Sequence, residues 1–94
     1  MDANIGIREI ERIVETGPAY VGPHGDALAH VYGTASALRD IASTEDQRER
    51  IARVVAEFKN WFRQTGGNTR AGTGGENEPV FAEIAKLRRA FADS

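Results

Sequence analysis

Apolar residues recur at helical spacing in four segments of this 94-residue chain, and no segment alternates with the two-residue period of a strand. The first segment, residues 3–16, carries a stripe formed by Ile7, Ile10, Ile13 and Val14. Ile5 falls off this stripe. The second segment, residues 26–42, places several apolar side chains on one face, with Ile41 at its edge: Leu28, Val31, Tyr32, Ala35, Leu38 and Ala42. Both segments are predicted to be amphipathic helices.

Two further helices are predicted in the second half of the chain. Residues 45–65 carry a stripe that Trp61 flanks and that consists of Ile51, Val54, Val55, Phe58, Phe62 and Thr65. Residues 79–92 carry a stripe of Val80, Phe81, Ile84, Leu87 and Phe91. Each stripe has to be buried, and four stripes that face inward achieve this at the present chain length.

Local signals mark the ends of these segments. Gly17–Pro18 is expected to end the first helix, and Asp26 is a good N-cap for the second. Thr44 followed three residues later by Gln47 is typical of a capping box at the start of the third helix. The stretch 66–78 holds five of the ten glycines and is predicted to be a flexible connector, after which Pro79 opens the last helix.

The expected fold is therefore a single all-α domain over residues 1–94, a small antiparallel bundle of about four helices. The long glycine-rich connector leaves two arrangements open for the fourth helix. It packs on its own bundle or, by domain swapping, on that of a second copy.

The composition excludes several classes of function. The chain has no cysteine, so it forms no disulfide, thiolate nucleophile or cysteine-based metal site. The N-terminal residues do not resemble a secretory signal, and no apolar run approaches the roughly 20 residues that span a bilayer. A soluble cytoplasmic protein of bacterial type is expected, with no cofactor and no membrane partner.

Charge is divided unevenly along the chain. Residues 1–47 contain three basic and eight acidic residues, whereas residues 48–94 contain nine basic and six acidic residues. Acidic and basic helices that face each other within one bundle would explain this division. A charged surface for a partner is the alternative.

No residue is predicted to be catalytic. His30, which lies on the second predicted helix, is the one weak candidate. It lies on the flank of the apolar stripe, one turn after Asp26, and its same-face neighbours Gly33, Thr34 and Ala37 are small. The segment AHVYGTASAL resembles the active helix of histidine-containing phosphotransfer domains, which are four-helix bundles. Here the glycine follows the histidine by three residues and not four, and no lysine precedes it. The resemblance implies a phosphotransfer role for His30, whereas the small residues alone imply close approach of another helix.

A metal site is a second hypothesis for the same region. His24, Asp26 and His30 together offer two imidazoles and a carboxylate that could share a divalent ion. Tyr20 and Tyr32 could join these residues in an enzyme site. Asp26 is better explained as a helix cap, and the histidines as a solvated pair.

Nucleic-acid binding is a third hypothesis. The third helix and the start of the connector carry several basic residues around Trp61: Arg48, Arg50, Arg53, Lys59, Arg63 and Arg70. No helix-turn-helix pattern accompanies them, and the glycine-rich stretch lacks the lysine and strand of a phosphate-binding loop.

The sequence best predicts a protein-interaction or regulatory module without catalysis. Its partner would be another protein or a second copy of the chain. The expected contact residues are of the types that dominate interface energetics: Tyr32, Trp61, Arg53 and Arg63.

Overall fold

The computed structural model describes residues 2–16, 27–65 and 78–92, which form four α-helices and, within these ranges, no strand. The helices are α1 (Ala3–Thr16), α2 (Ala27–Ile41), α3 (Glu45–Thr65) and α4 (Glu78–Ala92). The prediction of an all-α bundle is confirmed, and each helix begins and ends within one residue of its expected bounds. The signals at Gly17–Pro18 and Asp26 and the connector at 66–77 lie outside the described residues.

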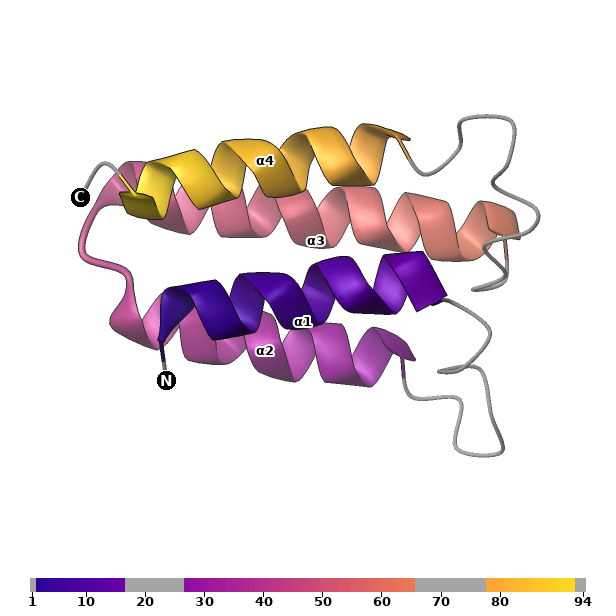
Figure 1. Cartoon of the computed structure of the whole chain (residues 1–94), viewed down its shortest axis with the longest axis horizontal. Helices are drawn as coiled ribbons and strands as arrows, with labels where there is room; N and C mark the ends of the chain where they lie inside the picture. Colours follow the sequence, from indigo (N-terminus) through magenta and orange to yellow (C-terminus); the bar gives the residue numbers. More distant parts are fainter. Residues whose placement is uncertain (1, 17–26, 66–77, 93–94) are drawn as a thin grey trace.

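The four helices form an antiparallel bundle in which successive helices run in opposite directions (Figure 1). Helices that follow each other in sequence pack together, and α4 closes the ring by packing on α1. The start of α1, the end of α2, the start of α3 and the end of α4 therefore lie together at one end of the bundle. Here α4 packs on its own chain, and swapping between copies stays a prediction.

Each helix contributes a stripe of fully buried side chains to one common core. Within a helix most buried positions lie three or four residues apart, which is typical of helices packed side by side at a small angle. The core consists of Ile7, Ile10, Ile13, Val14, Val31, Ala35, Leu38, Ile51, Val54, Phe58, Trp61, Val80, Ile84 and Leu87. Ile5, which the sequence placed off its stripe, is exposed.

Trp61 belongs to this core and does not flank it. Its side chain is 1% exposed, and its ring centroid lies 5.1 Å from that of Phe58. The buried stripe of α3 steps from Ile51 through Val54 and Phe58 to Trp61, so Phe62 falls at the edge and is only partly buried. This placement corrects the expectation that Trp61 is a contact residue for a partner, because a fully covered ring presents no surface.

The capping box at the start of α3 is present and extends to another helix. The backbone N–H of Gln47 donates to Thr44 Oγ1 (3.1 Å), and Gln47 Oε1 accepts from the backbone N–H groups of Ser43 (2.7 Å) and Thr44 (3.2 Å). Gln47 Nε2 donates to the carbonyl oxygen of Ala90 in α4, at 3.2 Å. Gln47 is the one polar residue buried in the described part of the chain, at 1% exposed. Its amide therefore joins the start of α3 to the end of α4.

A membrane-spanning helix is absent from the part of the chain that the structure describes, because none of the four helices is both long and apolar enough to cross a bilayer.

Candidate functional site on the outward side of α2

The solvent-facing side of α2 differs from those of α1 and α3. Val31, Ala35 and Leu38 are fully buried and fix the inward direction of the helix. At roughly 100° per residue, the opposite side carries a row of small residues that ends in one acidic residue. We call this row the α2 outer face: Ala29, Gly33, Ser36, Ala37 and Asp40.

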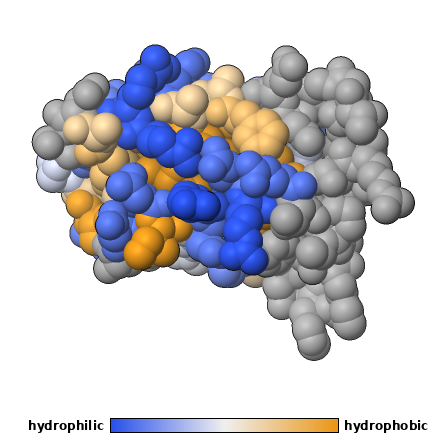
Figure 2. Space-filling view, in the orientation of Figure 1, coloured by the Kyte–Doolittle hydropathy of each residue, from blue (hydrophilic) through white to orange (hydrophobic). Residues whose placement is uncertain are grey.

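Charged side chains are missing from most of this surface. Between Ala29 and Leu38 no aspartate, glutamate, lysine or arginine occurs. The exposed sides of α1 and α3 instead carry many charged groups, and Figure 2 shows hydrophilic side chains in a band along α1. Large charged side chains oppose the approach of another surface, because their charges lose water on contact. The α2 outer face is therefore easier to cover than the outward sides of α1 and α3.

Gly33 lies at the centre of the α2 outer face and is exposed. A Cβ atom built on it meets no heavy atom within 4 Å. Glycine inside a helix is destabilising by about 1 kcal/mol relative to alanine. The described residues give no packing reason for this cost, since no neighbouring helix approaches at this point.

His30 borders the α2 outer face on the side of α1. Its Nε2 lies 3.2 Å from Oε2 of Glu9, whose other oxygen is 3.6 Å from Arg12 Nη1. Both the imidazole and the carboxylate are partly exposed. The contact holds the ring against α1 with Nε2 directed at a carboxylate, so a phosphoryl group on Nε2 would adjoin a negative charge.

Tyr32 borders the α2 outer face on the side of α3. The sequence placed it within the apolar stripe, but it is 37% exposed, because its position on the helix turns it toward the α2–α3 boundary. Lys59 Nζ lies 5.6 Å from the centre of the Tyr32 ring, a cation–π contact between the two helices. His30 and Tyr32 thus lie on opposite flanks of α2 and do not converge on one site.

The proposed metal ligands are only partly within the described residues. His24 and Asp26, like Tyr20, lie outside them. Among the residues that the structure does describe, no group of three or more histidine, cysteine, aspartate or glutamate side chains is placed to hold a metal ion. His30 and Glu9 form a pair without a third such ligand in these segments.

The basic residues of α3 contact groups of the same chain. Arg53 pairs with Glu49 at 3.2 Å, as their i,i+4 spacing predicts, and Arg63 donates to Asn60 Oδ1 at 2.6 Å. The remaining described members also have partners: Arg48 with Glu45, Arg50 with Asp46 and Glu83, and Lys59 with Tyr32. Arg70 lies outside the described residues. These pairings offset much of the positive charge along the helix.

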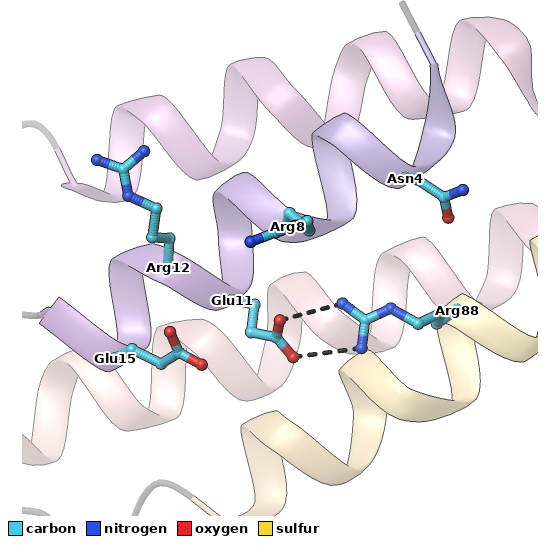
Figure 3. A pocket seen from close by; sticks show the side chains of 6 residues that line it. All are labelled: Asn4, Arg8, Glu11, Arg12, Glu15 and Arg88. Carbon is cyan, nitrogen blue, oxygen red and sulfur yellow. Dashed lines mark hydrogen bonds and ion pairs between the residues drawn. The ribbon is translucent and has the colours of Figure 1, made fainter.

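The structure contains a groove between α1 and α4 that the sequence did not predict. It has a volume of about 510 Å³ and is lined by Asn4, Arg8, Glu11, Arg12, Glu15 and Arg88 (Figure 3). Arg88 reaches across from α4 and donates to both carboxylate oxygens of Glu11, at 3.1 and 3.3 Å. This ion pair joins the acidic first half of the chain to the basic second half, as the first explanation of the charge division requires. No local pattern could reveal it, because its partners are 77 positions apart.

Comparison of the chain with protein-family models, with curated proteins and with solved structures found no match.

Proposed function

We propose that this protein acts by binding a protein partner through the α2 outer face. The observation that carries the proposal is Gly33, a destabilising residue in mid-helix with open space where its side chain would be. Close approach of an external backbone would account for a residue without a Cβ atom at that position. The small neighbours Ala29, Ser36 and Ala37 allow an equally close approach along the helix.

The flanks of the α2 outer face supply the larger groups that such an interface needs. Tyr32 offers a partly exposed aromatic ring, and tyrosine is among the residue types that most often dominate binding energy. Ile41 is 40% exposed at the end of the helix and offers an apolar contact. Of the contact residues expected from the sequence, Tyr32 fits this surface, whereas Arg53 and Arg63 lie on α3.

The alternative functions have less support. The contact of His30 Nε2 with Glu9 disfavours a phosphoryl group on that nitrogen, and the described residues supply two candidate metal ligands. The pairing of the α3 arginines with acidic and amide groups weakens their attraction for nucleic-acid phosphates.

A matched pair of substitutions tests the proposal. Gly33→Arg places a long charged side chain at the centre of the α2 outer face, and Ala82→Arg places the same side chain on an exposed position of α4, on the opposite side of the bundle. Circular dichroism and thermal unfolding first establish that both variants fold. Each tagged form is then chemically cross-linked in its native cells, and the attached proteins are quantified by mass spectrometry.

We expect one defined protein to be cross-linked to wild type and to Ala82→Arg. This protein is either a different protein or a second copy of the chain. Its recovery should fall at least about tenfold with Gly33→Arg, the equivalent of 1.4 kcal/mol of binding energy. Equal recovery by all three forms, or a selective loss with Ala82→Arg, would refute the use of the α2 outer face.

A further inference from the structure

The last turn of α2 carries two charged side chains that nothing in the described part of the chain engages. Arg39 and Asp40 are both exposed, and neither side chain makes a hydrogen bond or ion pair there. Asp40 belongs to the α2 outer face, whereas Arg39 lies on its α3 flank, the same flank as Tyr32. Ile41 lies on the α1 flank, the same flank as His30.

We propose, on the basis of the function proposed above, that the partner at the α2 outer face is a second copy of this chain. The two copies of α2 would pack antiparallel about a two-fold axis near Ala35 and Ser36. The argument rests on the order of charged, aromatic and apolar groups along one helix, which is complementary to itself when reversed.

Symmetry decides which flanks meet in such a pair. A two-fold axis that relates two antiparallel helices keeps the α3 flank of one copy beside the α3 flank of the other. Tyr32 of each copy then faces Arg39 of the second copy, an arrangement in which a guanidinium stacks on an aromatic ring. Near the α1 flank, His30 faces Asp40 of the second copy, so the unpaired carboxylate meets an imidazole.

These pairs agree on a single register. The midpoint of His30 and Asp40 is residue 35, and the midpoint of Tyr32 and Arg39 lies half a residue further on. Gly33 with Ala37 and Ala29 with Ile41 also have their midpoints at residue 35. Each pair recurs by symmetry on the other side of the axis, so one register satisfies both unpaired charges and covers the exposed isoleucine against an alanine.

Close packing of the two helices requires small residues at the crossing, and the α2 outer face has them. Packed helices are separated by about 8–10 Å according to the side chains at the contact, and glycine and alanine allow the lower limit. The outward sides of α1 and α3 carry long charged residues instead, such as Arg8, Arg12, Glu49 and Arg53. A second copy on those faces would remove many charges from water.

The expected association is weak and reversible. Residues 29–41 span about 18 Å of helix, so the interface lies at or below the roughly 1,200 Å² of the smallest stable complexes. A dissociation constant on the order of 10 µM is consistent with that area. Sedimentation equilibrium from about 1 µM to 1 mM covers this range, and we expect a monomer–dimer equilibrium.

Substitutions locate the interface. Gly33→Arg should raise the dissociation constant at least about tenfold, whereas Ala82→Arg should leave it unchanged. A strictly monomeric wild-type protein throughout the range would overturn the inference. A dimer that Gly33→Arg leaves intact would overturn it equally.

Single cysteines establish the antiparallel register, because the chain has no cysteine of its own. About the proposed axis the two copies of residue 36 are only about 3 Å apart along the helix, whereas the two copies of residue 29 are about 18 Å apart. Ser36→Cys should therefore form a disulfide dimer under mild oxidation, and Ala29→Cys and Ala82→Cys should not. Cross-linking through Ala29→Cys would contradict the antiparallel arrangement.

The two proposals can fail separately. A monomeric wild-type protein whose cross-linked partner in cells is a different protein, lost with Gly33→Arg, overturns the second copy as partner and retains the function of the α2 outer face. A dimer that Gly33→Arg does not affect, together with cross-linked partners that it does not affect, overturns both.

Discussion

Replacement of Gln47 by alanine should destabilise the bundle by about 3 kcal/mol. The substitution removes the acceptor of the Ser43 and Thr44 N–H groups, which corresponds to the loss of a capping interaction of about 1 kcal/mol. It also removes the hydrogen bond to the Ala90 carbonyl, about 1 kcal/mol, and buried side-chain carbon worth about 0.8 kcal/mol. For a chain of this length the loss corresponds to a Tm lower by roughly 12–24 °C.

Urea unfolding followed by far-ultraviolet circular dichroism measures this difference directly. Gln64→Ala is the matched control, because it makes the same change on the same helix at an exposed position, and it should alter the free energy of unfolding by less than about 0.5 kcal/mol. If Gln47→Ala and Gln64→Ala unfold alike, the proposed contribution of the buried amide is refuted.

Gln47→Glu separates the two roles of the side chain. A carboxylate still accepts from the backbone N–H groups of Ser43 and Thr44, but it cannot donate to the Ala90 carbonyl when ionised. We expect a loss of about 1–2 kcal/mol at pH 7. Wild-type stability in this variant would mean that the link to α4 contributes nothing.

Three further experiments test the core, the α2 outer face and the α1–α4 ion pair. Trp61→Ala should lower the free energy of unfolding by about 3–5 kcal/mol in urea titrations, and a loss below 1 kcal/mol would contradict its place in the core. Gly33→Ala should raise the stability of the dilute monomer by about 1 kcal/mol, whereas a loss would reveal a contact that the described residues do not show. A double-mutant cycle of Glu11→Ala and Arg88→Ala should give a coupling energy of about 0.5–1 kcal/mol that falls with added salt, because the side chains are 28% and 40% exposed. A coupling energy of zero at low salt would show that the bidentate geometry has no energetic effect.

The sequence predicted the helices well because their signals are local. A three-and-four spacing of apolar residues determines a helical stripe, and the Thr44–Gln47 capping box acts across three residues. Such interactions do not depend on how the helices are placed in space. The Glu49–Arg53 ion pair is local in the same sense, since it follows from an i,i+4 spacing on one helix.

Contacts between helices could not be predicted from local sequence patterns. The stripe of α3 could be drawn through either Trp61 or Phe62, and only the positions of α2 and α4 decide that Trp61 is covered. Tyr32 was placed on the apolar face of the second helix by its spacing, although its angle on α2 turns it toward Lys59. The openness around Gly33 likewise depends on which helices are its neighbours, and the sequence could only identify the residues there as small.

The short link between α2 and α3 has a consequence for the order of folding. Residues 42–44 are all that separates these two helices, whereas the Glu11–Arg88 contact between α1 and α4 joins positions 77 apart. Closing a short loop costs less chain entropy than closing a long one, so the α2–α3 hairpin should form in the transition state and the α1–α4 contact after it. Weakening the hairpin would then slow folding, and weakening the α1–α4 contact would chiefly speed unfolding.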